Sequence, residues 1–250
     1  MELAFDFKRF ALLIRRESAL SYKPVLIALG GILGALVLNF ISIVMDQYSS
    51  PRELSFHEGA YTAFLLIGGF VFSSLAFSSL HHPLRKFGYL LLPASSLEKY
   101  LSMLVLTSIG WLLGFTLVYK VFAEVANGIT HAITPVTVIP FNPFGETELG
   151  GIKIYIIVQA MFLCGAAYFK NYTLFRTLLT LLIVGMLLSF AAYLVFADMI
   201  YVGENIQEPN ESFKEFVEKD LPEIAEFMFH WVMAPLFWVI GYFAVKEKEV

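Results

Sequence analysis

The chain is poor in cysteine and in charged residues, and each shortage excludes a class of protein. Its single cysteine, Cys164, allows neither an internal disulfide nor a cysteine-based zinc site in 250 residues. Charged residues make up 15% of the chain, against about 25% in soluble domains, and the net charge is −4. An acidic, sparsely charged chain offers no basic surface, so we expect no nucleic-acid partner.

Several sequence motifs of enzymes are also missing. There is no G-x-x-x-x-G-K-[ST] phosphate loop, no H-E-x-x-H zinc motif and no G-x-S-x-G nucleophile elbow. Charged residues deep inside the apolar runs, which would mark an ion or proton path, are scarce. We therefore expect this chain to be no enzyme, to carry no catalytic, cofactor-binding or metal site, and to need an energy source on another chain if it transports anything.

What the chain has in abundance is apolar surface. Hydrophobic residues make up 58% of it, against about 45–50% in soluble domains, and 25 residues are phenylalanine. The mean hydropathy is +0.72. A soluble chain of this size could not bury that much apolar surface in one core. The composition predicts an all-α, polytopic membrane protein that forms one membrane domain over residues 1–250.

Six apolar runs, bounded by charges or turn residues, are long enough to cross a bilayer. A spanning helix needs roughly 20 mainly apolar residues. The runs do not alternate apolar with polar residues, as strands of a membrane barrel do. The predicted spans are residues 24–45, 60–80, 100–119, 154–169, 177–199 and 227–245.

Lysine and arginine are distributed unevenly between the two sides that these spans define. Twelve lie on the side that holds both chain ends, and five lie on the other. Short cytoplasmic segments carry the excess of positive charge in membrane proteins. The count predicts a multi-pass protein of the cell (inner or plasma) membrane with both termini in the cytoplasm.

The segment before the first span, residues 1–23, has the pattern of an interfacial helix. Within residues 3–18, apolar residues recur at 3-4 spacing on one face, and four cations fall on the other. Such a helix lies in the headgroup plane, near anionic lipid or a cytoplasmic partner. The alternative is an ordinary positive flank that only sets the topology. The four cations are Lys8, Arg9, Arg15 and Arg16.

Residues 81–99 are predicted to form a cytoplasmic segment with its own local structure. Pro83 ends the second span, and Pro93 ends a short apolar stretch. Ser95 or Ser96 can then cap a new helix that carries Glu98 in its first turn. An apolar hook flanked by cations suits docking to a soluble partner. The alternative is a loop tucked against the bundle.

Two further segments are expected on the external side. Residues 121–151 contain three prolines and a β-branched run, and should lie on the outer surface of the bundle. Residues 202–226 are acidic, and Ser212 with Glu215 has capping-box spacing. This predicts a short outer helix with a solvated acidic face; cation binding by its acids is the less favoured alternative.

In this layout the sequence resembles a permease subunit of the ABC transporter type-2 (exporter) family. The local match is L-P-A-S-S-L-E-K at residues 92–99, which is similar to the turn where such permeases enter their third span. The resemblance implies two permease copies, identical or related, and two ATP-binding subunits that hold ATP and Mg²⁺. It also implies a coupling role toward those subunits for Leu92, Pro93, Ser95, Ser96, Glu98 and Lys99.

Two other functions stay open at this point. The chain could be a non-transporting scaffold or accessory subunit of a membrane complex. It could also be a membrane-embedded enzyme, for which His81 and His82 are the neighbouring metal candidates. The loop at 121–151 is longer, and the fourth span shorter, than the permease pattern leads us to expect, and the sequence does not identify a substrate.

Overall fold

The computed structural model describes residues 5–47, 53–54, 56–81, 83–133, 137–201 and 219–249. Within these ranges nearly every residue is helical, which confirms the all-α fold. The exception is a two-residue parallel pairing of β1 (Glu53–Leu54) with β2 (Thr137–Val138). Six helical stretches are long and apolar enough to cross a membrane, so the chain is a multi-pass membrane protein. They are Val25–Met45, Gly59–His81, Ser96–Ala132, Glu146–Tyr168, Thr173–Leu194 and Glu223–Glu249.

The helices follow one another with few long connections. Two of the long rods contain a π-helical turn, η1 in the third and η3 in the last. In chain order the elements are α1 (Phe7–Gln47), α2 (Phe56–Leu75), α3 (Ser78–His81), α4 (Pro83–Leu90), α5 (Ser96–Val105), η1 (Leu106–Gly110), α6 (Trp111–Ile133), α7 (Glu146–Tyr168), α8 (Thr173–Tyr201), α10 (Leu221–Phe227), η3 (Met228–Val232) and α11 (Met233–Glu249).

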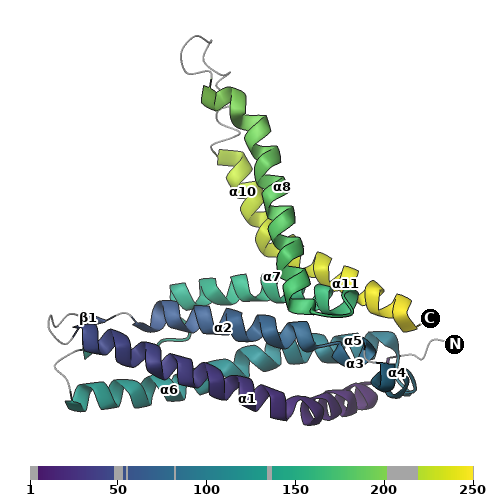
Figure 1. The fold of residues 1–250 in the computed structure, drawn as a ribbon, viewed down its shortest axis with the longest axis horizontal. Helices are drawn as coiled ribbons and strands as arrows, with labels where there is room; N and C mark the ends of the chain where they lie inside the picture. Colours follow the sequence, from purple (N-terminus) through teal and green to yellow (C-terminus); the bar gives the residue numbers. More distant parts are fainter. Residues whose placement is uncertain are drawn as a thin grey trace.

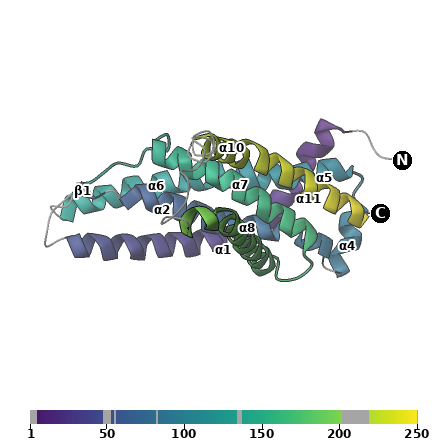
Figure 2. The same ribbon diagram turned by 90° about the horizontal axis from the view of Figure 1, so that it is seen from above.

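The sequence predicts an interfacial helix that is separate from the first span, but the structure joins the two. Residues 7–47 form one helix, and Figure 2 shows its first part running in a different direction from the rest. Pro24 lies within this helix, between the predicted interfacial segment and the predicted first span. A proline inside a helix lacks one backbone donor and bends the helix without necessarily ending it. The upstream residues are good helix formers with no glycine stop, so the helix continues through it.

The third and fourth rods are also longer than predicted. Helix α6 continues beyond the predicted span end at residue 119 to Ile133, and α7 begins at Glu146, before the predicted span start at residue 154. Lys120 and Glu124 are exposed on α6, so a charged pair there does not require the helix to stop. Glu146 and Glu148 lie in the first turn of α7, where acids favour a helix start. The expected 121–151 loop therefore contracts to residues 134–145.

The acidic segment is expected at 202–226, and residues 202–218 of it lie outside the described residues. That range includes the predicted Ser212–Glu215 cap. Its described remainder is helical: α10 runs into η3 and α11 without a break from Leu221 to Glu249, and the direction changes between α10 and α11 (Figure 1).

The long helices α1, α2, α6 and α7 run along one another, and α11 lies against α7 (Figure 1). The start of α1, helices α3 and α4, the start of α5 and the end of α11 all meet at one end, which we call the termini end. At the other end lies a cluster of buried rings, which we call the aromatic end; it comprises Phe40, His57, Tyr61, Tyr119 and Phe141.

Close packing of α7 depends on small residues. A Cβ added to Gly69 would lie 2.2 Å from the Tyr155 ring, and one added to Gly165 would lie 2.1 Å from the Thr177 hydroxyl. Glycine lets membrane helices approach to such distances. These contacts join α7 to α2 on one side and to α8 on the other.

Helix α8 differs from the rest of the bundle. With α10 beside it, α8 leaves the other long helices steeply (Figure 1), and most of its apolar side chains from Leu178 to Leu194 are exposed. Its first turns, around the buried Thr177, pack on α7, and α8 also contacts α2. A helix that is apolar on every face must be covered by lipid or by another chain.

Candidate functional site at the termini end

Helix α4 and the turn after it present an apolar surface to the outside. Phe87 is 72% exposed and Leu91 is 81% exposed, and Arg85 and Lys86 on the same helix are also exposed. Tyr89 points the other way and is buried in a cluster with Phe77 and Tyr100. The short helix therefore has one side packed on the bundle and one side carrying two large apolar groups, with the exposed Lys86 next to Phe87.

The turn into α5 is closed by the predicted cap, which the structure confirms. The Glu98 backbone N–H donates to Ser95 Oγ over 3.2 Å, and the Ser95 backbone N–H donates to Glu98 Oε2 over 2.8 Å. This reciprocal pair is a capping box. It fixes where α5 begins and the direction in which the chain leaves α4.

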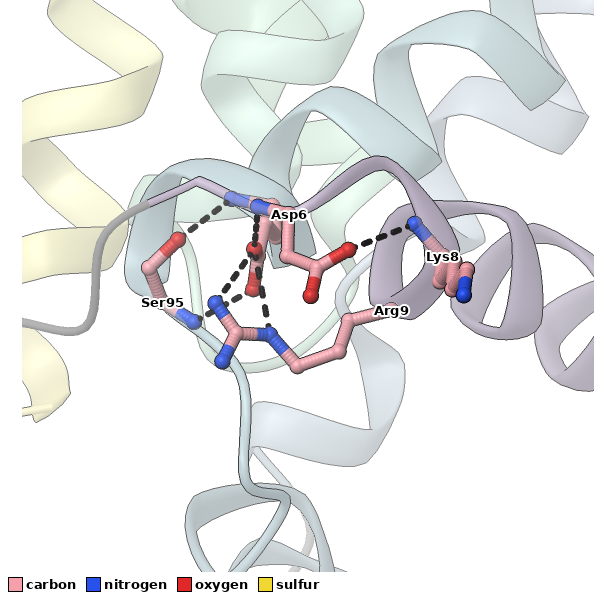
Figure 3. A network of polar contacts seen from close by, with 5 residues as sticks. Asp6, Lys8, Arg9 and Ser95 are labelled. Atoms are coloured by element: carbon pink, nitrogen blue, oxygen red, sulfur yellow. Dashed lines mark hydrogen bonds and ion pairs between the residues drawn. The ribbon is translucent and has the colours of Figure 1, made fainter.

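The other carboxylate oxygen of Glu98, Oε1, accepts hydrogen bonds from residues at the start of the chain (Figure 3). The Arg9 guanidinium donates to Glu98 Oε1 from Nη2 at 3.0 Å and from Nε at 3.4 Å. The Asp6 backbone N–H donates to the same oxygen over 2.6 Å. Glu98 is completely buried under these groups. One carboxylate thus joins the first turn of α5 to the first turn of α1.

A second acidic residue joins the end of the chain to the same turn. Lys99 Nζ lies 3.1 Å from Glu249 Oε1, and the Ser96 hydroxyl donates to the other oxygen of Glu249. Lys99 is 4% exposed, and its ammonium group lies 5.2 Å from the centre of the Tyr89 ring. Glu98 and Glu249 therefore connect α1, α5 and α11 immediately beside α4.

The structure brings the predicted coupling residues together, with unequal exposure. Pro93 is exposed, Leu92, Ser95 and Ser96 are half-buried, and Glu98 and Lys99 are buried. The exposed groups that a partner could touch, Phe87 and Leu91, were missed by the sequence analysis. The available signal was spacing: Phe87 and Leu91 are four residues apart and share one side of a helical turn, whereas Tyr89, two residues from each, faces the other side.

The four cations predicted for the membrane-surface helix divide in the same way. Lys8 and Arg15 are exposed, as expected of a surface helix. Arg9 instead turns inward to Glu98, and Arg16 pairs with its neighbour Glu17, which is 5% exposed. The buried side of this segment carries Leu13 and Glu17, because the segment packs against α5.

A cavity of about 620 Å³ opens between α1, α2, α4 and the α5–η1–α6 rod. Arg16, Glu17, Arg85 and Tyr89 line it near the termini end, and Phe72 and Trp111 line its deeper part. Burial raises the pKa of Glu17 above its ordinary value, and the neighbouring Arg16 opposes that shift. This is the only lining carboxylate among the residues that the structure describes.

The histidines proposed for an enzyme do not form a metal centre in the described part of the chain, where no group of three metal-ligating side chains occurs. His81 Nε2 donates to the Ala166 carbonyl over 2.9 Å, which fixes the end of α2–α3 to α7. His82 lies outside the described residues.

His57 is buried at the aromatic end. Its Nδ1 lies 3.1 Å from the Tyr119 hydroxyl, and its Nε2 lies 3.0 Å from Asn127 Oδ1. Burial lowers the pKa of His57 below its ordinary value of 6.5. The imidazole is therefore a neutral bridge between α2 and α6.

No protein-family model, curated protein or solved structure matches this chain.

Proposed function

We propose that this chain is the membrane-spanning permease subunit of an ATP-driven exporter, and that a separate ATP-binding subunit docks on α4 and the turn after it. The observation that carries the proposal is the pairing of an exposed apolar surface, Phe87 and Leu91, with a rigid connection to the helices behind it. A docking surface needs large apolar anchors surrounded by charge.

The connection supplies a route for mechanical coupling. A partner that displaces α4 also displaces the capped turn that follows it. Glu98 transmits that movement to α1 through Arg9, and Glu249 transmits it to α11 through Lys99. Rigid-body movement of packed helices is a common mode of switching in proteins. The ATP and Mg²⁺ belong to the partner chain in this scheme.

The docking test compares two exposed apolar surfaces at opposite ends of the bundle. The chain is purified from its natural host in mild detergent, and MgATP hydrolysis by the purified complex is measured. The partner is identified by mass spectrometry as a protein with a phosphate loop. F87S/L91S is expected to lose both the partner and the hydrolysis. The control is F144S, because Phe144 is 80% exposed and lies before α7, away from α4.

An unchanged complex in F87S/L91S would contradict docking on α4. Recovery of membrane proteins without any ATP-binding chain, from wild type and variants alike, would favour the scaffold function instead.

The proposal also places both termini in the cytoplasm. Cys164 is the only cysteine, so C164S provides a background for single labels. In that background we expect a membrane-impermeant maleimide to label F144C on intact cells and to leave L91C unlabelled until the cells are opened. Labelling of L91C from outside would invert the orientation and exclude a cytoplasmic ATP-binding partner at α4.

A further inference from the structure

The cavity between α1, α2, α4 and the α5–η1–α6 rod has two chemically different ends. Its deeper part is apolar: Val25 and Ala28 come from α1, Val71 and Phe72 from α2, and Leu106 from η1. Its volume of about 620 Å³ lies within the range of small-molecule sites, about 300–1,000 Å³. The cavity therefore has room for a ligand and not only for water.

The indole ring of Trp111 forms the floor of the cavity, and its neighbours hold it in place. Trp111 donates its indole N–H to the Leu65 carbonyl over 3.1 Å, which fixes the ring across α2. Gly68 makes room for it, because a Cβ added there would lie 2.2 Å from Trp111 Cζ2. The π-turn η1 immediately precedes Trp111, and such turns occur frequently at functional sites.

The end toward the termini is cationic. Arg16 is compensated by Glu17, but no carboxylate among the described residues forms an ion pair with Arg85. The serine hydroxyls of Ser21, Ser78 and Ser79 line the same region. One uncompensated guanidinium beside several hydroxyls is a favourable environment for an anionic group.

Tyr89 supplies a second, independent sign of a ligand. It lines the cavity and is 3% exposed, yet its hydroxyl has no hydrogen-bond partner within the described part of the chain. A buried polar group without a partner costs free energy, and native structures rarely keep one. An anionic group bound between Arg85 and Tyr89 would accept a hydrogen bond from each.

We propose that this cavity binds an anionic amphiphile, with its headgroup between Arg85 and Tyr89 and its apolar chain along Phe72 toward Trp111. Resting on the proposed function, we further assign this ligand class as the exported substrate. Binding itself needs no ATP-binding partner. Loss of binding and loss of docking are therefore separate failures: the first overturns the site, and the second overturns the permease.

Trp111 provides a direct probe of occupancy. The chain has three tryptophans, so W231F/W238F leaves Trp111 as the only indole. The protein is placed in phosphatidylcholine bilayers, and its fluorescence is titrated with a minor fraction of phosphatidylglycerol brominated on the acyl chain. Brominated phosphatidylcholine serves as the neutral lipid of the same chain chemistry. We expect the anionic lipid to quench Trp111 at much lower mole fraction than the neutral one.

Variants identify the headgroup contact. R85Q is expected to weaken the preference for the anionic lipid by about tenfold, the size of a lost charge-assisted hydrogen bond. The control is R15Q, since Arg15 is exposed on α1 and does not line the cavity. A28L fills the apolar part with Arg85 intact and should block quenching. Circular dichroism and gel filtration report whether each variant is folded.

Equal quenching by the two lipids, or a preference that survives R85Q, would overturn the proposal. Competition by glycerol phosphate without an acyl chain, as effective as the lipid itself, would show a site for a soluble anion and would overturn the amphiphile. If R15Q lost quenching to the same extent as R85Q, the lipid preference would come from general surface charge. That result would also overturn the proposed site.

Discussion

The two ends of the bundle are held together by different chemistry. At the termini end, charged side chains join distant parts of the chain: Arg9 reaches Glu98, and Lys99 reaches Glu249. At the aromatic end, neutral groups do the same work: His57 bridges Tyr119 and Asn127 among stacked and edge-on rings. Glu98 and Lys99 are buried, so the loss of either partner leaves an uncompensated charge, whereas the loss of one polar group at the aromatic end leaves the packed rings in place. The termini end is therefore the more sensitive to single substitutions, and its ion pairs tie α1, α5 and α11 together beside α4.

The largest expected effect comes from removing the carboxylate of Glu98. E98A removes the Glu98 half of the capping box and the partner of Arg9 together, and we expect it to lower the free energy of unfolding by about 2 kcal/mol, allowing for the 31% exposure of the Arg9 side chain. E98Q keeps the cap, because glutamine serves at this position of a capping box, and should cost less. Unfolding in mixed micelles measures both, and equal losses would mean that the cap contributes nothing.

A double-mutant cycle tests whether the second charged contact is a pair in energetic terms. E249Q leaves the buried Lys99 ammonium without its partner and should cost about 1 kcal/mol or more. K99M/E249Q removes both charges and should be more stable than E249Q alone. Strict additivity in the same unfolding assay would show that Lys99 and Glu249 do not stabilise one another.

Glu17 tests how the cavity responds to pH. Its raised pKa means that the carboxyl gains a proton above the ordinary value of 4.5 as the pH falls, with Arg16, Arg85 and Tyr89 as the groups facing it. Protonation releases Arg16, so anionic-lipid quenching of Trp111 should strengthen severalfold on acidification. E17Q should show the stronger quenching already at neutral pH and lose the dependence. A pH dependence that persists in E17Q would assign it to another group.

The smallest expected effect lies at the aromatic end. The folded state keeps His57 neutral, with a pKa below 6.5, so the unfolded state binds a proton first as the pH falls. The contribution of the neutral His57 to the free energy of unfolding is therefore fully present above pH 6.5, and it declines as the pH falls toward the lowered pKa. Thermal unfolding of H57Q should lack that decline. An identical decline in H57Q would mean that His57 is not the titrating group.

Some of this structure could be predicted from the sequence because the signals are local. Six apolar runs of the necessary length specify the polytopic fold, and Ser95 with Glu98 three residues later specifies a cap. The positions of Arg9 and Glu249 could not be predicted, because each meets a residue about ninety or more positions away. Only the packing of α1 and α11 on α5 brings them there.

The lengths of some helices could not be predicted either. The third apolar run ends at residue 119, whereas its helix continues to Ile133 with the charged Lys120 and Glu124 exposed on its surface. Gly30 and Gly34 have the spacing that permits close helix approach, yet a Cβ added to either would meet nothing within 4 Å. The glycines that matter, such as Gly69, are identified only when their neighbours on other helices are known.

The π-turn η1 has a consequence for everything that follows it along the rod. A π-turn accommodates one residue more than the α-helix around it, and each residue of an α-helix corresponds to a rotation of about 100°. The insertion therefore sets the angular phase at which Trp111, Phe115 and Tyr119 leave the helix. All three face the inside of the bundle. Shortening the rod by the single residue Ile109 would keep its backbone bonded and yet swing this whole aromatic row away from α2.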